Sequence, residues 1–191
     1  MNKQQKLTIN SKATVYIDYG NVYGWKDSLK KTVDPKVLFR YLKQYSHIES
    51  LNFFYGTDTN QKSVEFLNQI QKVGYNLITK SVKYITVGKV NNQEIRIRKC
   101  DFDIEICMNV YKQLNDGYQT FIFFSGDGDF APIYEFLIKQ HKKIIVIYEQ
   151  GHLGKEIWGI KKGLFKTRYS FLQVDKKIIP PIARGAWLKQ L

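Results

Sequence analysis

Short apolar runs that alternate with helical patterns are the feature of this sequence that most restricts its fold. The runs are rich in β-branched and aromatic residues, as strands are, and cover residues 13–17, 51–55, 75–78, 120–124, 144–148 and 169–174. Between them, apolar residues recur with helical spacing over residues 34–45, 62–73, 102–115, 130–140 and 153–162. Strands that alternate with helices are typical of a parallel sheet covered on both faces. The sequence therefore predicts an α/β fold, a three-layer α/β/α sandwich with a mostly parallel central sheet.

Residues 80–99 interrupt this alternation. The segment is rich in Lys and Arg and has turn residues at Gly88 and at Asn91-Asn92, so it is predicted to form a β-hairpin that turns at one of these two places. At 191 residues the chain fits a single domain. We expect an N-terminal segment (1–12), one globular domain (13–175) and a C-terminal extension (176–191) outside the sheet.

Charge and composition narrow the range of partners. Thirty Lys and Arg residues against 17 Asp and Glu give a formal net charge of +13, which attracts polyanions. Nucleic acid is therefore the leading partner, and a basic surface that only maintains solubility is the alternative. No apolar run is long enough to span a bilayer and no signal-peptide pattern is present, so we expect no membrane partner and a cytoplasmic location. Cys100 and Cys107 form no CxxC pair, which argues against structural zinc.

Three acidic residues directly follow predicted strands. Asp18 ends the first apolar run, and Asp127 and Asp129 follow the run at 120–124. In an open α/β sheet, ligands bind beyond the carboxyl ends of the strands, so these acids are candidates for one shared site. Two of them also have a structural alternative. Asp18 suits a turn between strand and helix, and Asp129 stands where it would cap the helix predicted at 130–140, whereas Asp127 has no such alternative.

A fourth acid lies on the core-facing side of a predicted helix. In the helix at 102–115, Asp103 falls on the same stripe as Ile106 and Val110, while Asp101 and Glu105 project elsewhere. A carboxylate on such a face needs a partner. The partner is either a basic residue such as Lys99 or a divalent cation shared with Asp18 and Asp127. Carboxylate oxygens without His or Cys favour Mg²⁺ or Mn²⁺ as that cation.

Basic and aromatic residues near these acids are candidate contacts for nucleic acid. Lys80, Arg98 and Lys99 fit contacts to phosphate groups, although a charged hairpin is also often a solvated sheet edge. Tyr23 and Trp25, just past Asp18, suit either stacking on a base or packing of the first helix.

Four segments of the sequence resemble the NYN domains, a branch of the PIN-like nuclease superfamily that includes the LabA-like bacterial proteins. The resemblance covers about residues 13–174. It is carried by YIDYGNVYG (16–24), GYNLITKSVK (74–83), KCDFDIEI (99–106) and SGDGDFAPIYEFL (125–137).

The resemblance implies a PIN-like α/β/α fold and metal-dependent ribonuclease activity. The implied acidic cluster consists of Asp18, Asp103, Asp127 and Asp129, which would bind Mg²⁺ or Mn²⁺ and serve catalysis. Asn21 and Ser125 lie within the matching motifs, so they join Lys80, Arg98 and Lys99 as candidate contacts for nucleic acid.

The chain also departs from the family pattern. Cys100-Asp101 stands where Gly-Asn is usual, and Asn109 stands where many relatives have an acid. Three hypotheses follow. The first is a metal-dependent ribonuclease that acts on RNA, with DNA as a possible second substrate. The second is a catalytically weak or inactive nucleic-acid-binding regulatory module of the same fold. The third is a structural protein whose acids are only helix caps.

Overall fold

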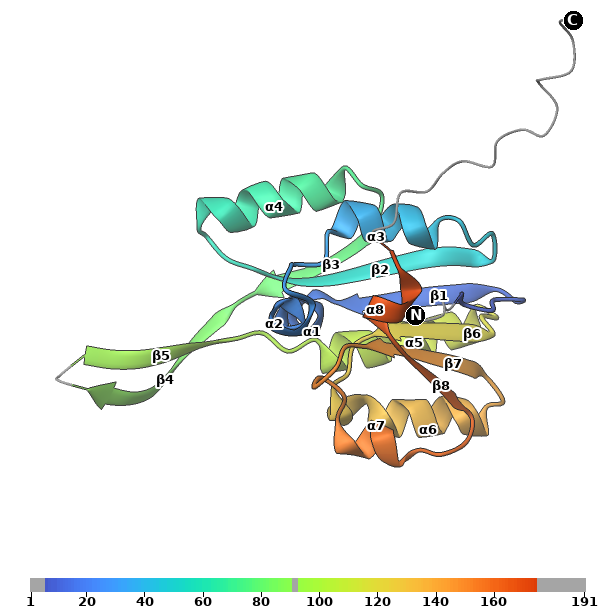
Figure 1. Cartoon of the computed structure of the whole chain (residues 1–191). Helices are drawn as coiled ribbons and strands as arrows, with labels where there is room; N and C mark the ends of the chain where they lie inside the picture. Colours follow the sequence, from blue (N-terminus) through green and yellow to red (C-terminus); the bar gives the residue numbers. More distant parts are fainter. Residues whose placement is uncertain (1–5, 91–92, 175–191) are drawn as a thin grey trace, which may run out of the picture.

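The computed structural model of this chain describes residues 6–90 and 93–174 (Figure 1). Its centre is a six-stranded sheet in the order β3-β2-β1-β6-β7-β8, and every neighbouring pair in this sheet is parallel. The strands of the sheet are β1 (Ala13–Asp18), β2 (Ile48–Thr57), β3 (Asn76–Ser81), β6 (Thr120–Phe124), β7 (Lys143–Tyr148) and β8 (Leu164–Arg168). The predicted parallel sheet is therefore confirmed.

Helices cover both faces of this sheet. They are α1 (Tyr19–Gly24), α2 (Lys26–Leu29), α3 (Pro35–Leu42), α4 (Gln61–Gln71), α5 (Asp103–Asn115), α6 (Ala131–Lys139), α7 (Lys155–Gly159) and α8 (Tyr169–Leu172), with a 3₁₀ turn, η1 (Gly128–Phe130), before α6. One apolar core joins the sheet to α1, α3, α4 and α8, and a second joins its other face to α5, α6 and α7. Figure 1 shows α3 and α4 on one side of the sheet and α6 and α7 on the other. The predicted three-layer α/β/α sandwich is thus confirmed. Leu7 and Ile9, which precede β1, are also buried in the first core.

The segment 169–174 differs from its prediction. A strand was expected there, but the sixth strand is β8, which ends at Arg168, and the chain then turns into α8. Tyr169 and Leu172 are both buried three residues apart, which is a helical spacing. The buried carboxylate of Glu149 accepts hydrogen bonds from the Ser170 backbone N–H at 2.9 Å and from its hydroxyl at 3.2 Å. This contact from the end of β7 stabilises the start of the short helix.

The predicted hairpin forms an arm that extends away from the sandwich (Figure 1). Its two antiparallel strands are β4 (Lys83–Val90) and β5 (Gln93–Lys99), and all their side chains are exposed. Gly88 lies inside β4 at a shift in the pairing register, so the hairpin does not turn there. The alternative turn at Asn91-Asn92 lies outside the described residues, as does the predicted C-terminal extension at 176–191.

The strand order of the sheet reverses between β1 and β6, which makes this place the topological switch point. From β1 the chain adds β2 and β3 on one side, and it later adds β6, β7 and β8 on the other side. Ile17 of β1 pairs with Phe124 of β6, so the residues that follow these strands emerge side by side at the carboxyl edge of the sheet. A reversal of strand order is where open α/β sheets bind ligands. Within the described residues, no helix is long and apolar enough to cross a membrane.

Candidate active site

Asp18 is the last residue of β1, at the switch point between β1 and β6. Its carboxylate accepts a hydrogen bond from the Asn21 backbone N–H at 3.4 Å and so caps α1. Burial of the carboxyl group, followed by the negative charges of Asp127 and Asp103, raises the pKa of Asp18 to about 6. The capping role that the sequence offered as an alternative is therefore present. The Asp18 carboxylate is also repelled by Asp127 and Asp103. A helix cap alone does not require other acids nearby.

The Asn21 side chain joins α1 to the loop that follows β6. Its Oδ1 accepts hydrogen bonds from Trp25 Nε1 at 3.2 Å and from the Gly126 backbone N–H at 3.1 Å. These bonds favour a positioning role for Asn21, which the sequence suggested as a contact for nucleic acid. Trp25 is fully buried and packs against Tyr169 at a ring-centroid distance of 5.8 Å, so its packing alternative is correct. Tyr23 remains exposed.

The loop after β6 holds the next pair of acids. Ser125 is buried, and its hydroxyl accepts a hydrogen bond from the Asp127 backbone N–H at 3.3 Å. Asp127 in turn accepts one from the Asp129 backbone N–H at 3.1 Å and caps η1. The structural alternative was expected at Asp129, but α6 begins after Phe130 without a side-chain cap. The reason is the 3₁₀ turn, which moves the cap two residues earlier and leaves Asp129 exposed.

Asp103 is the first residue of α5 and is half-buried. Burial raises its pKa, and the charges of Asp127, Asp101 and Asp129 add to this effect. The suggested pairing of Asp103 with Lys99 is not what the structure contains, because Lys99 Nζ lies 3.1 Å from Asp101 Oδ2. Farther along α5, the buried side chain of Gln113 accepts a hydrogen bond from the Tyr16 hydroxyl of β1 at 2.6 Å. This bond helps to hold α5 on the sheet.

The four acids form one electrostatic cluster at the carboxyl edge of the sheet, which we call the acidic cluster (Asp18, Asp103, Asp127 and Asp129). Asp127 and Asp103 each raise the pKa of Asp18, and Asp127 and Asp129 raise that of Asp103. Within residues 6–90 and 93–174, no group of three or more His, Cys, Asp or Glu side chains is arranged so that it could hold a metal ion. The oxygen donors fit Mg²⁺ or Mn²⁺ by their chemistry, although they do not form a finished coordination shell.

Tyr134 is a residue of this region that the sequence analysis missed. It lies on α6, is fully buried, and its hydroxyl has no hydrogen-bond partner among the described residues. Burial first, and then the charges of Asp127 and Asp18, raise its pKa well above the usual range. A buried hydroxyl normally has a partner. An unpartnered donor near two mutually repelling carboxylates supports a ligand-binding role for this edge.

The basic candidate contacts are already engaged with acids of the same chain. Lys80 Nζ lies 2.7 Å from Glu105 Oε1, and Arg98 Nε lies 3.9 Å from Asp58 Oδ2. Lys80, Arg98 and Lys99 are all partly exposed despite these pairs. Partly exposed ion pairs are weak, so they leave these cations available to phosphate groups.

The fold and the site together define a class: an α/β/α protein with an acidic cluster at its topological switch point. The chain belongs to the NYN domain family, a PIN-like nuclease family, because the family model for the NYN domain matches residues 12–157. It is 25% identical over 149 residues to the low amplitude and bright protein LabA of Synechococcus elongatus, which covers 77% of this chain and 78% of that protein. PIN-like nuclease domains generally use divalent metal ions.

A solved structure supports the fold. A crystal structure of a protein of unknown function from Vibrio parahaemolyticus matches with a TM-score of 0.64 and 18% sequence identity. The match covers 85% of this chain and 96% of that one.

The raised pKa of Asp18 predicts how its charge affects stability in the absence of divalent cations. Because the pKa rises from 3.8 to about 6 on folding, the folded protein binds more protons than the unfolded chain between these values. The contribution of Asp18 to stability therefore falls as the pH rises through this range, and its full cost is present above it. Asp18→Asn keeps a capping side chain and removes the charge.

We expect Asp18→Asn to raise the free energy of unfolding at pH 8 by up to about 3 kcal/mol, with the gain disappearing near pH 4. Urea denaturation in EDTA at the two pH values measures this difference. An equal gain at pH 4 and pH 8 would show that the charge is not its cause.

Proposed function

We propose that this protein is a metal-dependent ribonuclease that hydrolyses phosphodiester bonds of RNA at the acidic cluster. The observation that carries the proposal is that Asp18 and Asp127 follow the paired strands β1 and β6, with Asp103 at the start of α5 near enough for the three charges to interact. Uncompensated repulsion among acids is costly, and a cation removes it. Membership of a PIN-like nuclease family and the net charge of +13 support RNA as the substrate.

Each acidic residue has a role in this proposal. Asp18, Asp103 and Asp127 would hold one or two Mg²⁺ or Mn²⁺ ions, and Asp129, which is exposed, would assist them. The bound cation supplies an activated water and stabilises negative charge on the phosphate. Tyr134 has a free hydroxyl that is suited to hydrogen-bond a cluster carboxylate and hold its orientation. Lys80, Arg98 and Lys99 would contact the RNA backbone. A cytoplasmic location and domain limits of 13–175 are part of the same proposal.

One observation favours the second candidate, a nucleic-acid-binding module with little or no activity. Asn109, which stands where an acid is expected in many relatives, has a buried Oδ1 atom without a hydrogen-bond partner among the described residues. An amide there cannot supply the negative charge of a carboxylate. Loss of that charge would weaken cation binding at the cluster.

A cleavage assay separates the two candidates. Purified protein is incubated with end-labelled single-stranded RNA in Mn²⁺, in Mg²⁺ or in EDTA, with a DNA strand of the same sequence as a comparison. The ribonuclease proposal expects RNA fragments that appear only with a cation. It also expects a cation-dependent rise in the thermal unfolding temperature, because binding to the folded state stabilises it. Salt-sensitive RNA binding without fragments in any cation would support the binding module instead.

A further inference from the structure

A pocket of about 680 Å³ is lined in part by Asp18 and by no residue of the loop that carries Asp127. Its walls come from α1, the carboxyl end of β2, the start of α4 and the base of the β4–β5 hairpin. This volume is within the range of about 300–1,000 Å³ that is usual for small-molecule sites. The pocket and the acidic cluster share Asp18, so a ligand group bound at one is next to the other.

Aromatic rings form much of the pocket wall. Tyr19 and Phe66 are stacked with a ring-centroid distance of 5.1 Å, and Tyr55 lies 4.8 Å from Phe66. Two further lining rings are open to solvent, since Tyr23 is 47% and Tyr84 is 54% exposed. Exposed aromatic faces beside a pocket are the groups on which unpaired bases stack.

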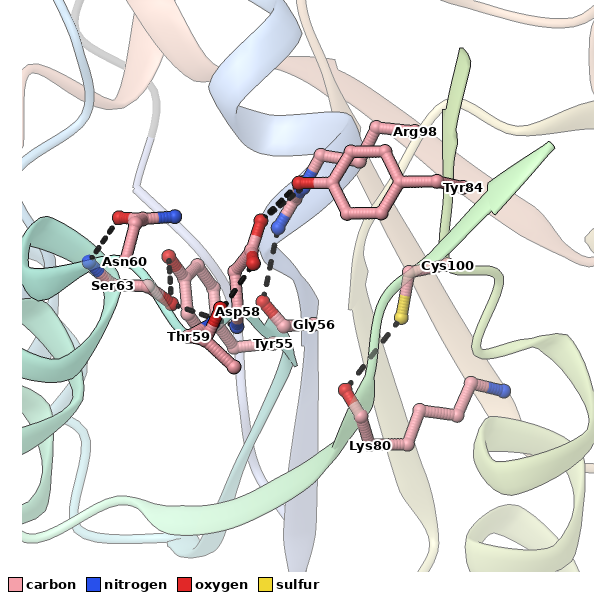
Figure 2. Close-up of polar contacts among 10 residues, drawn as sticks. All are labelled: Tyr55, Gly56, Asp58, Thr59, Asn60, Ser63, Lys80, Tyr84, Arg98 and Cys100. Carbon is pink, nitrogen blue, oxygen red and sulfur yellow. Dashed lines mark hydrogen bonds and ion pairs between the residues drawn. The ribbon is translucent and has the colours of Figure 1, made fainter. Parts of the chain in front are cut away.

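A polar network forms the other part of the wall and ties the hairpin to the body of the protein (Figure 2). The Tyr84 hydroxyl donates a hydrogen bond to Asp58, and Arg98 Nη2 donates one to the Gly56 carbonyl at 3.1 Å. The bond from Tyr84, and then a bond from the Thr59 backbone N–H and the charge of Arg98, lower the pKa of Asp58. Asp58 is therefore an anionic acceptor held in place at the pocket wall. Its carboxylate retains capacity for a further donor, such as the N–H group of a base edge.

We propose that this pocket binds one unpaired nucleobase of a single-stranded RNA whose neighbouring phosphate lies at the acidic cluster. This inference rests on the proposed function, because it takes RNA as the substrate. Tyr23 and Tyr84 stack on the base, and Asp58 accepts a hydrogen bond from its edge. A base that is paired in a duplex cannot enter the pocket. The pocket therefore selects single-stranded over double-stranded RNA, and the hairpin contributes directly to substrate binding through Tyr84 and Arg98.

The test measures binding without cleavage, so it does not depend on catalysis. Fluorescence anisotropy in EDTA gives the Kd of a labelled single-stranded RNA 12-mer for the wild type and for Tyr23→Ala and Tyr84→Ala. Base stacking predicts that each substitution raises Kd by about 5- to 150-fold. The matched control is Tyr111→Ala, which removes a tyrosine on α5 that is outside the pocket and at least as exposed, and it is expected to change Kd less than twofold.

Two further measurements identify the cause of any weakening. Tyr84→Phe keeps the ring and loses only the bond to Asp58, so it is expected to bind more tightly than Tyr84→Ala. A ribose-phosphate 12-mer without bases is expected to bind weakly and to be insensitive to Tyr84→Ala. The tyrosine variants should leave the salt dependence of Kd unchanged, whereas Arg98→Gln should lower its slope by about one.

The pocket assignment fails if Tyr23→Ala and Tyr84→Ala bind RNA as the Tyr111→Ala control does, or if the RNA without bases binds as well as normal RNA. These outcomes are distinct from failure of the ribonuclease proposal. A wild type that cleaves RNA while the tyrosine variants bind normally overturns only the pocket. Base-dependent binding that the tyrosine variants lose, in a protein that never cleaves RNA, supports the pocket and overturns the ribonuclease.

Discussion

Asp127→Asn is expected to reduce metal-dependent cleavage of single-stranded RNA by about a hundredfold or more, the size seen when one group that stabilises charge in an active site is removed. Asparagine is as good a helix cap as aspartate. The bond from the Asp129 backbone N–H to residue 127, and with it the start of η1, is therefore retained. The substitution removes negative charge from the centre of the acidic cluster with little effect on the fold.

Initial cleavage rates in Mn²⁺, measured alongside thermal unfolding, check this prediction. Asp116→Asn is the matched control, because Asp116 is an exposed aspartate at the end of α5, away from the acidic cluster. We expect the control to keep the wild-type rate and Asp127→Asn to lose both cleavage and the rise in unfolding temperature caused by Mn²⁺. Wild-type cleavage by a folded Asp127→Asn protein would mean that the activity lies elsewhere.

The fold was largely predictable because its signals are local. The apolar runs of β1, β6 and β7 are buried on both faces, so they stand out in the sequence as nearly continuous hydrophobic segments. The segment from Leu164 to Leu172 was not predicted correctly. Its strand is only partly buried and gives a weak pattern. The helix that follows depends on a hydrogen bond that the Ser170 backbone N–H donates to Glu149, which is distant in sequence.

The acids of the proposed site were chosen from similarly local signals. Strand ends and helical spacing indicated Asp18, Asp103 and Asp127 as neighbours, and in the structure Asp127 raises the pKa of both Asp18 and Asp103. The spacing of residues in the sequence does not reveal which hydrogen-bond partner each polar side chain will have. Whether Asp127 or Asp129 caps the turn depends on a single 3₁₀ turn.

Tyr134 illustrates the same limit. In the sequence it is one more aromatic residue on an amphipathic helix, and only the packing of α6 against β6 brings it near enough for the charges of Asp127 and Asp18 to raise its pKa. Trp25 is the converse case, because the sequence left it open to base stacking and the structure buries it completely.

The close packing of the Gly126 loop determines the second large effect, which is on stability. Gly126 follows Ser125 at the end of β6, and its carbonyl accepts a hydrogen bond from the Gly154 backbone N–H at 2.7 Å. A Cβ atom at position 126 would lie 1.5 Å from the His152 carbonyl oxygen. The obstacle is backbone rather than a flexible side chain, so a substitution must move the loop that carries Asp127.

Gly126→Ala is therefore expected to lower the free energy of unfolding by about 3 kcal/mol or more, at the upper end of overpacking effects. Because this is a large fraction of the stability of a typical domain, the variant should also express poorly. Urea denaturation measures the loss, with Gly159→Ala as the control, since a Cβ there would contact nothing within 4 Å. The control should be neutral or slightly stabilised, because alanine reduces the entropy of the unfolded chain. Equal stability of the two variants would contradict the close packing of the loops that hold Asp127 beside the end of β1, and with it the rigid placement that the proposed nuclease site requires.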